Sequence, residues 1–191
     1  MEIEYEASFT NIDKETMRQK LQDAGATLIK PEFLQKRRVF KLPAGHEIHG
    51  GWLWVRDEGD KINMSLKIVD GDKIENQREI CLKVDGFENG CELFRMIGCT
   101  EKAYQENKRE LWHLGDAEVT IDEWPFLEPF IEVEAKSEKS VRVIAQKLGL
   151  DYASAKFCAV GTLYGEKYGL PENQINNETP KIIFEMENPF L

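Results

Sequence analysis

The chain has 191 residues, of which 41% are hydrophobic and 31% charged, a composition typical of a globular domain rather than a disordered segment. Its apolar runs are too short to span a bilayer, and the acidic start MEIEYEASF does not resemble a signal peptide. The net charge of −10, from 35 acidic and 25 basic residues, disfavours nucleic acids and anionic membranes as partners. Four cysteines without a Cys-x-x-Cys pair predict reduced thiols and a cytoplasmic protein.

The first half of the chain alternates between strand-like and helix-like patterns. Residues 2–9 alternate in polarity, which predicts a strand. Asp13 then caps a predicted helix that carries Met17 and Leu21 on one face and ends at Gly25. The next strands are predicted at 35–42, 52–57, 61–70 and 78–84.

The second half repeats this mixture. Asp85 is predicted to cap a second helix and Ser137 a third, and a last helix is expected within 152–168. A polar tail begins at Pro171, with a short strand expected near 182–186. The remaining strands are predicted at 104–113, 117–123 and 129–135.

Eight strands joined mostly by short connections predict an α+β fold with one antiparallel sheet. We interpret residues 1–170 as one barrel domain and residues 171–191 as an extension packed on it. No motif decides the oligomeric state, so a homodimer stays open.

Charged side chains recur on one face of the predicted strands. Because side chains alternate along a strand, Glu2, Glu4 and Glu6 point away from Ile3 and Tyr5. A solvated outer sheet face would explain this pattern, and alternation alone does not decide between that and a charged cavity. If the sheet closes with its apolar faces outward, the cavity holds the acids Glu2, Glu4, Glu6, Glu79, Asp122, Glu132 and Glu134 and the bases Arg56, Lys67, Lys83 and Arg109.

Clustered carboxylates need cations or close bases, because like charges repel in a confined space. Carboxylate oxygens suit Mg²⁺ or Mn²⁺, which commonly hold the phosphates of a substrate. Arg and Lys side chains would then bind phosphate oxygens. The predicted cavity therefore carries the groups that phosphoryl chemistry requires.

Short motifs in a fixed order add a family resemblance. They are Glu2-Ile-Glu4, Leu53-Trp-Val-Arg56, Ser65-Leu-Lys67, Lys108-Arg-Glu110, Ile121-Asp122 and Phe130-Ile-Glu-Val-Glu134. This order, running from residue 2 to about residue 168, resembles the CYTH superfamily of class IV adenylate cyclases, thiamine triphosphatases and tripolyphosphatases.

The resemblance implies a closed eight-stranded antiparallel barrel, or tunnel, with flanking helices. It also implies a small-molecule triphosphate as ligand and Mg²⁺ or Mn²⁺ as cofactor. From the resemblance and the charge pattern together, Glu2, Glu4 and Glu79 are the candidate catalytic residues. Candidate metal ligands are Glu4, Asp122, Glu132 and Glu134, and candidate triphosphate ligands are Arg56, Lys67, Lys83, Arg109 and Arg37.

Several positions depart from the family pattern. Glu6, Trp54 and Asn107 stand where that pattern has basic residues, and Cys81 stands where it has an acid. The loss of positive charge predicts weak or absent turnover of free triphosphates. Among Lys36, Arg37 and Arg38, one inward-facing side chain is a candidate replacement, with Arg37 the first choice.

The leading functional interpretation is a metal-dependent protein that binds and hydrolyses a triphosphate such as tripolyphosphate, a nucleoside triphosphate or thiamine triphosphate. A class IV type adenylate cyclase, which makes cyclic AMP and pyrophosphate from ATP, is the second. A catalytically degenerate tunnel that binds a ligand without turnover is the third.

Overall fold

The strands of the computed structural model, which describes all residues from 1 to 191, belong to one sheet. Along the sheet their order is β1-β6-β5-β4-β3-β7-β8-β9-β2, each neighbour antiparallel to the next, and β10 adds to β7 in parallel. The strands are β1 (Glu2–Ile3), β2 (Tyr5–Phe9), β3 (Thr27–Lys41), β4 (Gly51–Asp57), β5 (Ile62–Val69), β6 (Gln77–Val84), β7 (Thr100–Leu114), β8 (Ala117–Glu123), β9 (Phe130–Ala135) and β10 (Lys181–Ile182).

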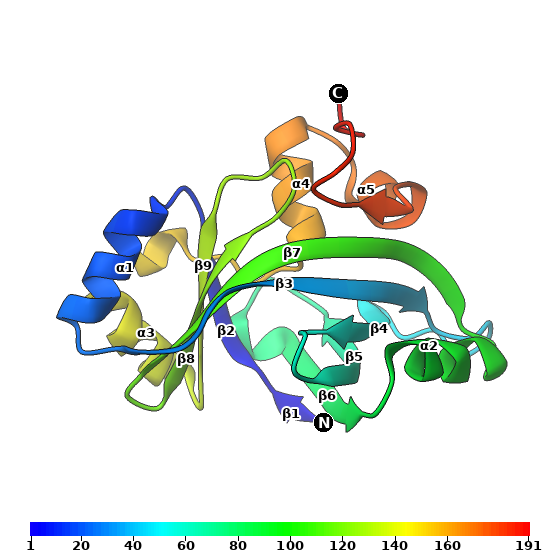
Figure 1. Ribbon diagram of the computed structural model, residues 1–191, viewed down its shortest axis with the longest axis horizontal. Coiled ribbons are helices and arrows are strands. Elements are labelled where there is room, and N and C mark those ends of the chain that lie inside the picture. The colour runs from blue at the N-terminus through cyan, green and yellow to red at the C-terminus, as the bar shows by residue number, and fades with distance from the viewer.

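The N-terminal segment brings the two edges of this sheet together. β1 pairs with β6 at one edge, and β2 pairs with β9 at the other. The sheet is thereby curled into a nearly closed barrel, as Figure 1 shows. The predicted antiparallel barrel is confirmed. Its strand path counts nine rather than eight because the chain breaks strand geometry at Glu4, which divides the predicted strand 2–9 into β1 and β2.

Two strands, β3 and β7, extend beyond their predicted starts and run side by side along the length of the molecule (Figure 1). The early part of β3 carries exposed apolar side chains, among them Leu28, Ile29 and Leu34. These residues do not alternate in polarity, so the period-two pattern begins only later in the strand.

Five α-helices flank the barrel, and their starts partly follow the predicted caps. Asp13 accepts a hydrogen bond from the backbone N–H of Thr16 at 2.8 Å, and Ser137 accepts one from that of Ser140 at 3.2 Å. Asp85 is not a cap, because the chain enters the second helix through Gly86 instead. The helices are α1 (Lys14–Asp23), α2 (Phe87–Met96), α3 (Glu138–Lys147), α4 (Val160–Tyr168) and α5 (Glu172–Glu178).

The hydrophobic core lies between these helices and the outer face of the barrel. α1 and α3 cover β2, β8 and β9, where Ile131 and Val133 are fully buried. α2 covers β4 and β5, with the ring of Phe94 packed edge-on against that of Phe40 at 5.3 Å. α4 and α5 lie over β7 on a further side, around Tyr164. The helices cover most of the apolar outer face of the sheet, although Ile80 and Leu82 of β6 stay exposed. The polar face of the strands is left for the interior of the barrel.

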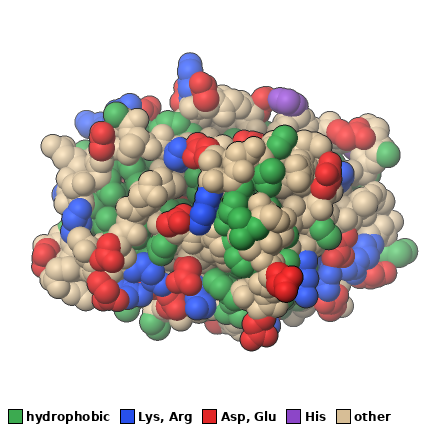
Figure 2. Space-filling model, turned by 90° about the horizontal axis from the view of Figure 1, so that it is seen from above, with side chains coloured by type: hydrophobic (Ala, Val, Ile, Leu, Met, Phe, Trp, Pro, Cys, Tyr) green, Lys and Arg blue, Asp and Glu red, His purple; other side chains and the backbone are tan.

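The outer surface carries charges of both signs. Figure 2 shows acidic and basic side chains interspersed over the face that bears α4 and α5, rather than gathered into a patch of one sign. No helix is both long and apolar enough to cross a membrane.

Candidate functional site

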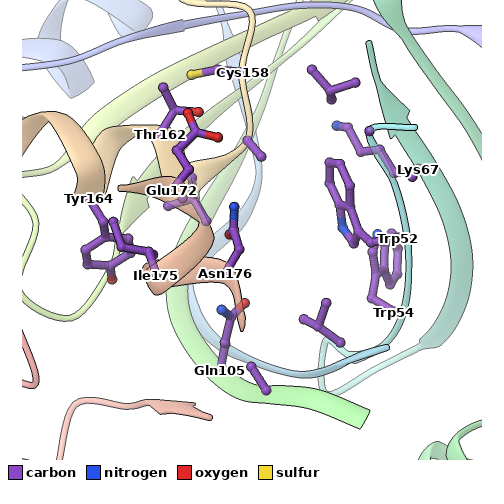
Figure 3. Close-up of a pocket in the computed structure, with 18 of the residues that line it drawn as sticks. Trp52, Trp54, Lys67, Gln105, Cys158, Thr162, Tyr164, Glu172, Ile175 and Asn176 are labelled. Carbon is purple, nitrogen blue, oxygen red and sulfur yellow. The ribbon is translucent and has the colours of Figure 1, made fainter. Parts of the chain in front are cut away.

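The interior of the barrel holds a cavity of about 960 Å³. Strands supply the largest part of its wall, and the segment from residue 155 onward, including α4 and α5, supplies one side. Figure 3 shows Trp52, Trp54 and Lys67 on one side, with Thr162, Glu172 and Asn176 facing them. A volume of this order accommodates a small organic ligand.

Lys67, on β5, lies between two glutamates from the N-terminal segment. Its Nζ lies 3.0 Å from Glu4 Oε2 and 3.3 Å from Glu6 Oε1. Burial alone would lower the pKa of Lys67, but Glu6 and Glu4 raise it well above its ordinary value. Burial would likewise raise the pKa of Glu6, yet Lys67 and Arg109 hold it below its ordinary range. Lys67 and Glu6 therefore form a charged pair inside the barrel.

Arg109, on β7, holds a second ion-pair network. It donates from Nε to Asp122 Oδ1 at 2.8 Å and from Nη2 to Asp122 Oδ2 at 2.9 Å and Glu132 Oε2 at 2.7 Å. Asp122, which is fully buried, also accepts hydrogen bonds from Asn107 and Thr120. Its two oxygens are thus occupied by the wall of the barrel, behind Arg109.

Three carboxyls are held in an environment that disfavours their charge. Burial raises the pKa of Glu4 to about 8, against the opposing effect of Lys67. Burial and the charge of Glu6 raise the pKa of Glu132 to about 8 and that of Glu134 to about 7. Their negative charge lacks full compensation from the protein. As the side chains stand, no three acidic, histidine or cysteine groups converge on a common metal position.

The opposite wall carries arginines. Arg56, on β4, donates from Nε to Glu58 at 3.0 Å, with its guanidinium 4.3 Å from the ring centre of Trp54. Arg37, on β3, donates from Nε to Gln105 at 2.8 Å and has no carboxylate partner. Burial, followed by the charges of Arg56 and Arg109, lowers the pKa of Arg37 to about 9.

Most predicted site residues come together in this cavity. Those that line it are Glu4, Glu6, Glu79, Glu132, Glu134, Arg37, Arg56, Lys67 and Arg109.

Four predicted positions do not line the cavity. The side chains of Glu2, Lys83 and Cys81 are exposed and lie outside its lining. Glu2 and Lys83 lie near the ends of their strands, where the inward face of the strand passes the end of the cavity and reaches solvent. Asp122 lies in the wall, as described above, rather than on the cavity surface.

Comparison with known proteins agrees with this architecture. The sequence matches the CYTH domain over residues 1–156, which is most of the chain. The chain belongs to the CYTH family. No curated protein matches it in sequence.

Solved structures with the same fold confirm the CYTH tunnel and are distant in sequence. A protein of Pyrococcus horikoshii OT3 shares 20% identity at a TM-score of 0.67, with 82% of this chain and 96% of that one covered. A candidate adenylate cyclase of Vibrio parahaemolyticus shares 11% at 0.72, with 85% and 97% covered. A candidate adenylyl cyclase of Hippeastrum, described as having a dominant triphosphatase activity, shares 12% at 0.55, with 87% and 97% covered.

The departures from the CYTH pattern have structural consequences. Glu6 lies in the cavity and pairs with Lys67, and Trp54 lies beneath Arg56. Asn107 is buried in the wall, where it binds Asp122. Of these substitutions, only Glu6 adds an acid beside a cation, Lys67.

Some cavity residues escaped sequence reasoning. Lys41 and Lys102 line the cavity, as do Trp52 and, from α5, Asn176. Trp52 lies on the same face of β4 as Trp54 and Arg56, so the alternation of side chains along the strand could have predicted that it lines the cavity. No signal in the sequence placed Lys102 or α5 at the cavity.

Proposed function

We propose that this protein binds a small-molecule triphosphate in its barrel together with Mg²⁺ or Mn²⁺ and hydrolyses it. CYTH membership supports triphosphate processing in general. The observation that carries the proposal for this chain is the division of one cavity into two walls. Arg37 and Arg56 lie on the β3–β4 side, and Glu4, Glu132 and Glu134 lie on β9 and the N-terminal segment.

The acidic wall suits a divalent cation in the chemistry of its donors. Glu4 Oε2 is buried and no hydrogen-bond donor is aligned with it, although Lys67 lies nearby. Glu134 forms neither a hydrogen bond nor an ion pair, and burial raises its pKa. Such carboxylates gain from a bound cation, which removes the cost of their charge. Glu4, Glu132 and Glu134 would therefore hold the metal, and their side chains would have to turn toward one another to do so, since no three such groups converge as they stand.

Asp122 is a poor metal ligand by the same reasoning, because Arg109, Asn107 and Thr120 already occupy its oxygens. Its role is to orient Arg109. When bound, the metal would neutralise phosphate charge and polarise the P–O bonds.

Side chains of the protein bind the phosphates and accept the proton of the attacking water. Arg56 and Arg37 bind phosphate oxygens from one side, and Arg109 binds from the other. Glu79, a candidate catalytic carboxylate that lines the cavity beside Glu4, accepts a proton from the attacking water. One water is consumed, the terminal P–O bond breaks, and orthophosphate leaves a diphosphate behind.

Product analysis tests this proposal directly. We expect purified protein with tripolyphosphate or ATP and millimolar Mg²⁺ or Mn²⁺ to release orthophosphate, measured by phosphate assay and chromatography. Cyclic AMP with pyrophosphate from ATP would assign the cyclase instead. Binding by calorimetry without any product would assign a non-catalytic tunnel, and absence of binding would refute the proposal.

A matched pair of variants ties the result to the cavity. Arg56→Gln removes a cavity cation and should lower kcat/KM about 10- to 100-fold, the worth of one charged hydrogen bond. Arg78→Gln removes an exposed cation from β6 and should leave kcat/KM unchanged. Equal effects of both substitutions would place the reaction elsewhere.

The non-catalytic tunnel keeps a specific observation in its favour. Lys67 and Arg109 are bound to the acids around them, so a triphosphate must compete with Glu6 and Glu132 for these cations. This competition is the structural reason to expect weak turnover.

A further inference from the structure

Three basic side chains in the cavity have no acidic partner. Seven bases line the cavity, and four of them form ion pairs: Arg56, Lys67, Arg109 and Lys156. The three without a carboxylate are Arg37, Lys41 and Lys102, on the adjacent strands β3 and β7. Arg37 and Lys102 are half-buried, and Lys41 is exposed. Neighbouring cations without an anion repel one another, so their presence in one cavity indicates an anionic ligand.

A β-bulge brings Lys102 into this group. On β7, Gln105 and Ala103 face the cavity, and unbroken alternation would place Glu101 there next. The pairing with β3 shifts at this point, since Val39 pairs with Ala103 but Phe40 pairs with Glu101. The extra residue, Lys102, therefore turns inward.

The bulge also moves a carboxylate out of the cavity. Glu101 points to the outer side of the sheet, where it binds Arg38 and Arg95. A cation thus replaces an anion at this position of the wall. Because bulges often redirect side chains at functional sites, this exchange indicates a local role rather than a chance irregularity.

The surroundings of the three cations keep them free to bind. Arg37 stacks its guanidinium 4.5 Å from the ring centre of Trp124, which holds it in place without neutralising it. Burial, and then the charges of Lys41 and Arg37, lower the pKa of Lys102 to about 8. Glu47 and Glu172 line the same cavity, but neither pairs with these cations.

The C-terminal segment shelters this end of the cavity. β10 pairs with β7, with Ile182 beside Gln105, and Asn176 and Asn177 of α5 line the cavity. Figure 3 shows Gln105 and Asn176 close together, across the cavity from Trp52 and Trp54. Partial exclusion of water strengthens an electrostatic contact made here.

We propose that Arg37, Lys41 and Lys102 form a separate anion subsite, which binds a phosphate or diphosphate group of the ligand. Three cations match a group with two or more negative charges better than a single carboxylate. The inference deepens the proposed function and rests on it for the chemistry of the ligand. It moves part of the phosphate binding away from Lys67 and Arg109, whose charge is already used, to the β3–β7 wall.

Pyrophosphate without metal is the probe that tests this subsite. We expect calorimetry in EDTA at about pH 7 to show pyrophosphate binding that Lys102→Met or Lys41→Met weakens about tenfold or more. Lys36→Met is the matched control, since Lys36 is an exposed neighbour on the outer side of β3 and should leave the affinity unchanged. Circular dichroism checks that each variant is folded.

Lys102→Arg distinguishes a charge effect from a packing effect. Arginine stays protonated, so this variant should bind as wild type does at about pH 7 and keep its affinity at about pH 9. Wild-type affinity should fall over the same range relative to Lys102→Arg, because Lys102 with a pKa of about 8 loses its charge unless ligand is bound. Equal pH dependence of the two proteins would overturn the assignment of Lys102.

The inference and the proposed function can fail separately. Pyrophosphate binding that depends on Lys102, without turnover of any triphosphate, would support the subsite and refute the hydrolase. Turnover with pyrophosphate affinity unaffected by Lys102→Met and Lys41→Met would refute the subsite alone. Absence of pyrophosphate binding would also overturn it.

Discussion

Replacing Glu134 with glutamine tests the electrostatics of the metal-free tunnel. This half-buried side chain forms no ion pair, and burial together with the charge of Glu6 raises its pKa from an ordinary 4.5 to about 7. A carboxyl with a higher pKa in the folded protein than in the unfolded chain keeps its proton on folding. Its ionisation therefore costs the folded protein stability, and this cost is absent at low pH and grows as pH rises toward the folded pKa.

The magnitude follows from these two pKa values. Well below pH ~4.5, both states are protonated and the group does not alter the free energy of unfolding. Between the two values the unfolded chain ionises first, which costs the folded state ~1.4 kcal/mol per pH unit. By about pH 8 the accumulated cost is about 3 kcal/mol. Glu134→Gln has no proton to lose, so it should be more stable than wild type by about this amount at pH 8 and nearly equal to it at pH 4.5.

Urea unfolding followed by tryptophan fluorescence in EDTA, at several values between about pH 4.5 and 8.5, measures this difference. Glu185→Gln removes an exposed carboxylate without an ion pair and serves as the control, with no pH-dependent change expected. Millimolar Mg²⁺ should reduce the advantage of Glu134→Gln, since a bound cation offsets the cost of ionisation. A variant that is no more stable than wild type at pH 8 would refute the reasoning.

Three further predictions address the metal, the missing cations and the barrel wall. Millimolar Mg²⁺ or Mn²⁺ should raise the melting temperature, and Glu4→Gln with Glu132→Gln should remove most of that gain; an unchanged response would place the ions elsewhere. Glu6→Lys with Trp54→Arg should strengthen tripolyphosphate binding measured by calorimetry and raise orthophosphate release, because two cations replace an anion and a neutral group beside the phosphates; unchanged binding would mean that other groups supply the charge. Tyr164→Phe should lower the free energy of unfolding by about 1–2 kcal/mol, because it deletes a buried 2.6 Å hydrogen bond to a backbone carbonyl, and an unaltered urea midpoint would contradict this.

Local patterns predicted much of the fold. Alternation placed a strand within every long strand of the barrel, and the side chains of Asp13 and Ser137 cap the helices that follow them. These signals are local, since a strand face or a cap depends on residues only a few positions apart. The local pattern was wrong at Asp85, which was predicted to cap the second helix although Gly86 is its N-cap residue. It also gave no indication of α5.

The candidate site was predicted in part, for a related reason. Alternation placed Glu4, Lys67 and Glu132 on one face, and they do line the cavity. It also extended that face to Glu2 and Lys83, because a period of two does not show where the barrel ends. Their roles in binding or catalysis stay predictions.

The sequence by itself determined which strands exist, which of their faces is charged and which family the chain resembles. Only the tertiary structure decided which charges neutralise one another. Lys67 meets Glu6 across 61 residues of chain and Arg109 meets Glu132 across 23, and such pairs depend on strand order and register. The bulge that turns Lys102 inward and Glu101 outward depends on pairing between β3 and β7. A β-bulge is defined by an extra residue relative to the paired strand, so the sequence of β7 alone does not reveal it. The inward position of Lys102 therefore follows only from the pairing of β7 with β3.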